Sequence, residues 1–498
     1  EYFFLYTRVI LMITEALGIN YYVIGPSLCL LMTGVLFIIS DLSLNLKTRY
    51  LGIVLTTGIF FTGVTIYLKI GEFARIGLSS HFSSMILLDE FALLGDVLLY
   101  FIAICTIPTI WTSSSVLGEK RTEAVVLVLM SLSGFMLMTS SEHYIMLFIG
   151  LEIGSISLYA LAGLNRKDSY SNEAALKYFL FGSFASAILV YGVALMYTAV
   201  SASGVYETSL SIAYIGEPNV PLTAIVGLAL FTFGLLFKVS AAPFHAWAPD
   251  VYQGAPTGYV GYMAAVVKGA SFIVLARMAT IVFPLLSLNR SIVFAIIAIL
   301  SVVIGSLFAM TQSDLKRLIA YSGVAQAGLI FSGIASGGVA VIASLFYLVV
   351  YMIQLVGLFV VVSIVADGFS STIDIDQLKG SLKKNPFLGI CFSVFLLGLA
   401  GMPLTSGFIA KFLLFTNLWA ADLYVWVIIF LIASVLGFYF YLKPIWTMSI
   451  EEPESEKTYV VSRTNSVVLS VLALLTIIFG VAPSSLLNIA NWVLSSYL

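Results

Sequence analysis

The sequence has 498 residues, of which 60% are hydrophobic and only 10% are charged, with a formal net charge of −2. Soluble domains carry about 25% charged residues, so this composition excludes a soluble fold. The balanced charge offers no basic surface for nucleic acid. The three cysteines, Cys29, Cys105 and Cys391, stand alone in apolar runs, so we interpret them as packing residues.

Apolar runs of about 20 residues, the length that spans a bilayer as a helix, follow one another along the chain. We predict about fourteen spans: 21–40, 50–70, 92–112, 123–141, 143–164, 174–200, 221–250, 257–281, 291–311, 316–336, 338–366, 385–418, 422–447 and 466–496. Residues 1–18 are a candidate for a further short segment, either interfacial or spanning. The fold class is therefore all-α and integral to the membrane, because a barrel would show short alternating strands instead.

Two of these spans contain helix-breaking residues at membrane depth. Pro243 interrupts 221–250, and Gly401, Pro403 and Gly407 interrupt 385–418. Such paired interruptions in the two halves of a transporter indicate its site. Each lies in the fourth helix of a five-helix unit, and an odd number of helices inverts the second unit relative to the first.

The domain boundaries follow from these units. We expect three N-terminal helices in 1–120, a first five-helix repeat with its broken helix in 121–285, a second repeat in 286–450, and a C-terminal helix in 451–498.

Lysine and arginine gather in the loops that follow odd-numbered spans, for example Lys120, Arg121 and the segment 379–384. The other side has only Arg8, Lys69, Arg75, Arg277 and Arg290. Because basic residues are retained on the inner side, both termini are expected to face outward. His245 and Asp250 then lie toward the inner face.

Five ionisable residues remain inside the predicted spans: Glu152, Lys177, Lys238, Lys268 and Lys411. Each costs about 2.5–3.5 kcal/mol at the bilayer centre, so such residues tend to be paired, hydrated and functional. The alternative is a static ion pair that holds helices together. For Lys177, close to the start of its span, a side chain that reaches the headgroups is a further alternative.

The helix faces around two of these residues favour a functional interpretation. Lys268 shares its face with Gly261, Ala264, Ala265 and Ser271, which are small and let helices or water approach. Glu152 shares its face with Ser155 and Tyr159, whose hydroxyl groups are able to hold water. Neither face is lined by leucine.

Several stretches resemble one known family. Six segments carry the resemblance: FKVSAAPFHAWAPDVYQGAPT (237–257), VVKGASF, GLEIGSISLYAL, EAALKYFLFGSFASAILVYG, SDLKRLIAYSGVAQAGL and GLAGMPLTSGFIAKF. They are similar to segments of the antiporter-like membrane subunits of respiratory complex I, the proton-pumping NADH:ubiquinone oxidoreductase. The VYQGAPT ending resembles subunit 2, and the lysine at 411 fits subunit 2 or 5. The resemblance covers roughly residues 120–420.

The resemblance implies a membrane-arm subunit that forms a proton-translocation channel, coupled to NADH oxidation and quinone reduction in other subunits. It implies no catalytic redox centre, cofactor or metal in this chain, with FMN, iron–sulfur clusters and ubiquinone in partner subunits. The partners it implies are other membrane-arm subunits, including antiporter-like ones, and phospholipids, with no nucleic acid. The implied location is the mitochondrial inner membrane, with a bacterial plasma membrane or a thylakoid as alternatives.

The resemblance also assigns roles to the buried charges. Glu152 and Lys238 are expected to form the charged pair of the inner half channel with Lys177 nearby, Lys268 is the central relay, and Lys411 leads outward. Pro243 and Gly401 to Gly407 would open their helices so that freed carbonyls and water solvate the neighbouring lysines. His245 is either a proton relay or a support of the break, and Asp250 and Tyr252 are expected to be structural caps.

Other function classes stay open at this point. A cation/proton antiporter subunit shares the PFH-x-W-x-P pattern, although VYQGAPT argues against it. The photosynthetic relative of complex I has a very similar subunit. A purely structural membrane scaffold is the third alternative.

Overall fold

The computed structural model describes residues 20–43, 48–112, 121–216, 219–286, 292–366, 372–452 and 459–497. In this part of the chain, twelve helices are long and apolar enough to cross a membrane, and two shorter apolar helices, Leu222–Lys238 and Pro386–Ala400, accompany them. The prediction of an all-α membrane protein with about fourteen spans is confirmed. The predicted segment 1–18 lies outside the described residues.

The first half of the chain contains three N-terminal spans and the helices of the first predicted repeat. They are α2 (Tyr21–Ile38), α3 (Thr48–Ile76), α4 (Glu90–Thr112), α6 (Arg121–Ser140), α7 (Tyr144–Ala162), α8 (Ser169–Val200), α9 (Val205–Ile215), α10 (Leu222–Lys238), α11 (Trp247–Gly254) and α12 (Thr257–Ile281). A small hairpin of β1 (Ser79–His81) and β2 (Ile86–Leu88) links α3 to α4. Neither this hairpin nor α9 was predicted.

The second half begins after a short 3-10 turn at Phe283–Leu286. Its helices are α13 (Ile292–Met310), α14 (Leu315–Ser336), α15 (Val339–Val365), α16 (Pro386–Ala400), α17 (Ser406–Ala420), α18 (Tyr424–Ile445), α19 (Arg463–Val481) and α20 (Ser484–Ser495). The predicted single span 466–496 is wrong, because the chain forms two helices, α19 and α20, and Pro483 precedes the second one. The domain boundaries stay a prediction.

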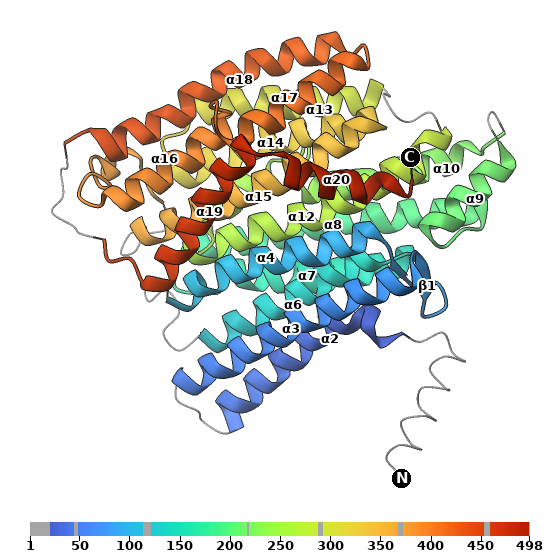
Figure 1. Ribbon diagram of the computed structural model, residues 1–498, viewed down its shortest axis with the longest axis horizontal. Coiled ribbons are helices and arrows are strands. Elements are labelled where there is room, and N and C mark those ends of the chain that lie inside the picture. Colours follow the sequence, from blue (N-terminus) through green and yellow to red (C-terminus); the bar gives the residue numbers. More distant parts are fainter. Residues whose placement is uncertain are drawn as a thin grey trace.

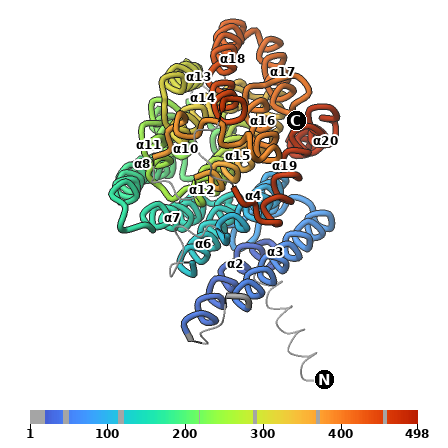
Figure 2. The backbone as a smooth tube through the Cα atoms, turned by 90° about the vertical axis from the view of Figure 1, so that its left-hand side faces the viewer, coloured from blue at the N-terminus to red at the C-terminus, as the bar shows by residue number. Residues whose placement is uncertain are grey.

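The helices pack side by side into one elongated bundle. Figure 1 shows α2 and α3 at one end and α18 at the opposite end, with α12 and α15 between them, and the second view in Figure 2 agrees. The most buried of the spanning helices are α12, α14 and α15. Because these three carry almost no lipid-facing surface, any polar group on them faces protein or water inside the bundle.

Candidate functional site

The first helix break lies between α10 and α11 and is held in place by hydrogen bonds. Helix α10 ends at Lys238, Ser240 has a left-handed backbone (φ 58°), and α11 begins at Trp247. The Ala242 N–H donates to Ser301 Oγ (2.8 Å), and Trp247 Nε1 donates to the carbonyl of Phe237 (3.1 Å). Pro243 lies within this irregular segment, so the predicted break is present and its backbone groups find partners inside the protein.

Lys238 lies buried at the end of α10, against one face of α7. Its Nζ donates to Ser155 Oγ (3.1 Å) and to the Tyr159 hydroxyl (3.0 Å), and it lies 5.6 Å from the centre of the Tyr159 ring. The side chain has only 2% exposure. The prediction that freed carbonyls solvate this lysine is wrong, because two hydroxyl groups of α7 take that role.

Glu152 lies one helical turn before Ser155, but it does not touch Lys238. Its Oε1 accepts from Ser186 Oγ of α8 (2.5 Å), and the described residues contain no ion pair between Glu152 and Lys238. Glu152 of α7 and Lys238 of α10 therefore interact electrostatically without direct contact, and Lys238 binds Ser155, one turn after Glu152 on α7. Glu152 is only partly buried.

Lys177 is partly exposed and is held by two carboxylates. Its Nζ contacts Glu173 (2.6 Å) and Asp250 (2.5 Å), and Asp250 also accepts from Arg317 Nη1 (2.6 Å). This network joins α8, α11 and α14. The expected position of Lys177 near the Glu152–Lys238 pair stays a prediction, and Asp250 ties three helices together rather than capping one.

His245 is half-buried in the first break. Its ring faces Tyr321 of α14, with the ring centres 6.3 Å apart, and its Nδ1 atom has no hydrogen-bond partner among the described residues. An unpartnered ring nitrogen is able to accept or release a proton. Both predicted roles for His245 remain consistent with this position.

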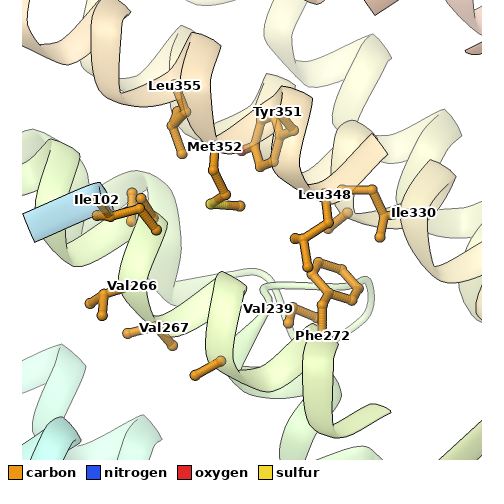
Figure 3. Packing of buried hydrophobic residues seen from close by; sticks show 14 of the residues in the cluster. Ile102, Val239, Val266, Val267, Phe272, Ile330, Leu348, Tyr351, Met352 and Leu355 are labelled. Carbon is orange, nitrogen blue, oxygen red and sulfur yellow. The ribbon is translucent and has the colours of Figure 1, made fainter. Parts of the chain in front are cut away.

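Lys268 lies in the middle of α12 with 1% exposure. Its Nζ donates to the carbonyl of Gly323 (3.0 Å) and reaches the Tyr351 hydroxyl (3.4 Å) on α15. Val266 and Val267 of α12 and Tyr351 and Met352 of α15 belong to the apolar packing in this part of the bundle (Figure 3). The ammonium group thus has polar partners inside an otherwise apolar wall.

The second break separates α16 from α17 and carries Lys411. Helix α16 ends at Ala400, Gly401 has a left-handed backbone (φ 86°), and Lys411 Nζ donates to the carbonyl of Ala400 (2.8 Å). Here the prediction that a freed carbonyl solvates the lysine agrees with the geometry. Pro403 is exposed in the break, and a Cβ on Gly407 would lie 1.8 Å from the Gly398 carbonyl oxygen, so only glycine fits there.

A buried polar cluster between Lys268 and Lys411 was missed in the sequence. Gln326 of α14 donates to the Leu399 carbonyl (3.0 Å) and to the Tyr441 hydroxyl (3.1 Å), and it accepts from the Tyr347 hydroxyl (2.5 Å). Gln326, Tyr441 and Lys411 also line one small cavity. The available signal was a glutamine inside an apolar span, which the search for charged residues passed over.

Two further buried ion pairs correct the assignment of basic residues to loops. Lys69 pairs with Asp96 (2.6 Å) and Arg277 pairs with Asp89 (2.6 Å), and all four side chains are at most 1% exposed. Lys69 and Arg277 lie in α3 and α12, not in loops. Lys316, counted with the inner loops, is also fully buried, and its Nζ donates to the Ala255 carbonyl (3.2 Å).

Comparison with known proteins identifies the family of this chain. Residues 141–437 match the family described as NADH:quinone oxidoreductase/Mrp antiporter, TM. NADH-quinone oxidoreductase subunit N of Parafrankia sp. (strain EAN1pec) is 39% identical over 377 residues, which cover 75% of this chain and 71% of that protein. The same subunit of Trichlorobacter lovleyi is 33% identical over 95% of this chain and 96% of its own length.

The structural comparison gives the same family. A chain in the structure of respiratory complex I from Thermus thermophilus with bound Aureothin is 28% identical, with a TM-score of 0.78, over 93% of this chain and 98% of that one. The matched region 141–437 contains both helix breaks and all of Glu152, Lys177, Lys238, Lys268 and Lys411. The chain therefore belongs to the antiporter-like membrane subunits of the NADH:quinone oxidoreductase/Mrp antiporter family.

Proposed function

We propose that this chain is a membrane-arm subunit of an NADH:quinone oxidoreductase complex and that it moves protons across the membrane. The observation that carries the proposal is a set of three buried lysines, Lys238, Lys268 and Lys411, which contact no carboxylate of the described residues. A static role would require a charge partner for each, because unpaired buried charges are costly. Groups that gain and lose a proton do not need a permanent partner.

The inner half of the proposed route is built around Lys238. The hydroxyl oxygens of Ser155 and Tyr159 accept hydrogen bonds from its ammonium group, and the same hydroxyl groups are able to donate a proton to the lone pair of a neutral amine. Glu152 lies on α7, one turn before Ser155. A change in the charge or position of Glu152 therefore acts on Lys238 through the poorly screened interior of the protein. His245 and Glu152 are the proposed proton donors to Lys238.

The outer half runs from Lys268 to Lys411 through the polar cluster of α14 and α15. Lys268 reaches the Tyr351 hydroxyl, and Tyr347 lies one turn away on the same helix and donates to Gln326. Gln326 contacts the carbonyl of Leu399, next to the Ala400 carbonyl that holds Lys411. We propose these hydroxyl and amide groups as the polar lining of the route, with water bridging its longer steps.

In this proposal the chain itself performs no redox reaction. Flavin, iron–sulfur clusters and ubiquinone are assigned to partner subunits. Other antiporter-like membrane subunits are proposed as further partners. The multi-pass chain lies in an energy-coupling membrane. The mitochondrial inner membrane stays a prediction, and the two curated relatives described above come from bacteria.

The cation/proton antiporter remains the second candidate, because the matched family includes Mrp antiporters. The observation that favours the oxidoreductase is the identity with subunit N over nearly the full length of both chains. Sodium-dependent transport by the complex would favour the antiporter instead.

The test is Lys268→Met in the assembled complex, reconstituted into vesicles. We expect quinone reduction coupled to proton uptake to fall about tenfold or more, because Lys268 joins the two halves and a lost general acid–base group typically costs that much or more. Lys316→Met is the matched control, since Lys316 is an equally buried lysine outside the route. Full pumping by Lys268→Met, at matched complex content, would remove Lys268 from the route.

A further inference from the structure

A crevice opens where the ends of several helices in the first half of the chain meet. It has a volume of about 820 Å³ and is formed by the C-terminal ends of α2 and α7 and the N-terminal ends of α6 and α8. Ligand pockets in proteins measure roughly 300–1,000 Å³, so the crevice is large enough for part of an elongated ligand. It lies where these helices end, at the level expected for lipid headgroups.

The crevice has two chemically different zones. Its walls are apolar, with Ile38, Leu42, Val126, Leu127 and Leu164 among the lining residues. The charged lining residues are Asp41, Glu123 and Arg166, of which Glu123 and Arg166 are exposed. Asp41 is held by the Thr122 hydroxyl, which donates to Oδ2 (2.6 Å). An apolar wall with a charged rim fits an amphiphile whose polar end stays in the interface.

We propose that this crevice binds a phospholipid with a primary-amine, zwitterionic headgroup of the phosphatidylethanolamine type. Arg166 takes the phosphate, because a guanidinium group binds phosphate oxygens with several N–H donors. Asp41 and Glu123 take the ammonium group, and an acyl chain follows the apolar wall. An anionic headgroup would meet two carboxylates for one guanidinium, and a choline headgroup has no N–H to donate.

The floor of the crevice connects the lipid to the buried site. Tyr159 lines the crevice, and its hydroxyl group accepts the hydrogen bond from Lys238 Nζ (3.0 Å). An acyl chain in the crevice would therefore hold the Tyr159 ring and keep bulk water from it. This consequence rests on the proposed function, whereas binding of the lipid does not.

The test measures binding by photolabelling of the purified, delipidated complex. A phosphatidylethanolamine with a photoreactive group on its acyl chain is added in detergent, and labelled peptides of this chain are mapped by mass spectrometry. We expect labels at Val126, Leu127 and Leu164. Unlabelled phosphatidylethanolamine should compete, whereas phosphatidylcholine and phosphatidylglycerol at the same ratio should compete much less.

Variants of the rim make the test specific. Arg166→Ala should lower the labelling by about threefold to tenfold, the change expected for up to about 1.4 kcal/mol of lost binding. Lys167→Ala removes an adjacent exposed positive charge that does not line the crevice and should leave the labelling unchanged. Glu123→Lys should shift the preference toward phosphatidylglycerol.

Three outcomes would overturn the proposal. They are labelling elsewhere in the chain only, equal competition by all three lipids, or unchanged labelling in Arg166→Ala. Because labelling is measured without turnover, a failed lipid test leaves the proton route standing. Loss of proton transport in Lys268→Met likewise has no bearing on whether the lipid binds.

Discussion

Glu142 is a single side chain that makes stability depend on pH. It lies in the turn between α6 and α7 with 4% exposure, its Oε1 accepts from the Tyr206 N–H (2.7 Å), and its Oε2 has no partner among the described residues. Burial raises the pKa of this carboxyl to about 7 from an ordinary value of 4.5. The folded protein therefore holds the proton more tightly than the unfolded chain does.

The sign of the effect follows from that shift. The folded state loses stability as the pH rises from about 4.5 through 7, because the buried carboxyl must then ionise. We expect Glu142→Gln to remove this loss, which is on the order of 3 kcal/mol at most. The melting temperature of the variant complex should therefore exceed that of the unmodified complex by more at pH 8.5 than at pH 5.5. The measurement is the melting temperature of both proteins across this range.

Glu207 supplies the opposite control nearby. The Ser203 N–H donates to its carboxylate (2.9 Å), and this bond lowers the pKa of Glu207. Its contribution is present above the ordinary pKa and is lost as the pH falls through the lowered value. Glu207→Gln should therefore lower the melting temperature by a similar amount at pH 5.5 and at pH 8.5, and a gain in stability at pH 8.5 like that of Glu142→Gln would contradict the account of Glu142.

At the scale of elements, the second break depends on one glycine. A Cβ at position 407 would lie 1.8 Å from the Gly398 carbonyl oxygen, so Gly407→Ala must push α17 away from α16. We expect overpacking of about 1–3 kcal/mol and a displaced Lys411, seen as less complex in the membrane and lower proton pumping per complex. Normal amounts and activity would show that the two helices separate without cost.

Gly71→Ala is the matched control for that substitution. Gly71 lies in α3, and nothing lies within 4 Å of a Cβ placed there. Alanine also has the higher helix propensity, so this variant should assemble and pump like the unmodified protein.

The elements themselves were largely predictable, because hydropathy and helix breakers are local properties. Pro243 and the glycines around Pro403 marked both breaks, and the 3.6-residue period placed Ser155 and Tyr159 on one face of α7. The partner of that face was not predictable. Lys238 lies 79 residues after Tyr159 in the chain, and the rotation that brings it to the hydroxyl groups, and not to Glu152, comes from helix packing.

Buried ion pairs were missed for a related reason. Lys69 and Arg277 lie near helix ends, where a hydropathy window stops at a charged residue, so they were assigned to loops. Their partners Asp96 and Asp89 are distant in sequence, and the pairing that makes burial tolerable is visible only in three dimensions. Gln326 was missed because it carries no charge, although an amide in an apolar span also needs partners.

At the scale of the whole molecule, the polar groups of both repeats converge on the central helices. Lys238 lies directly before the first break, Lys411 follows the second, and Lys268 lies on α12, one of the three most buried helices. The lipid-facing helices at the two ends of the bundle surround this interior (Figure 2). The arrangement supports one polar route enclosed by apolar packing, in which Lys238 exchanges protons rather than only holding helices together.

The most direct measurement of that claim is proton pumping by vesicles that contain complexes with Lys238→Arg. Arginine keeps its charge and is able to donate to the Ser155 and Tyr159 hydroxyls, but it does not release its proton at accessible pH. The account predicts that Lys238→Arg assembles and yet pumps as poorly as Lys238→Ala. Pumping by Lys238→Arg equal to that of the unmodified protein, at matched complex content, would contradict it.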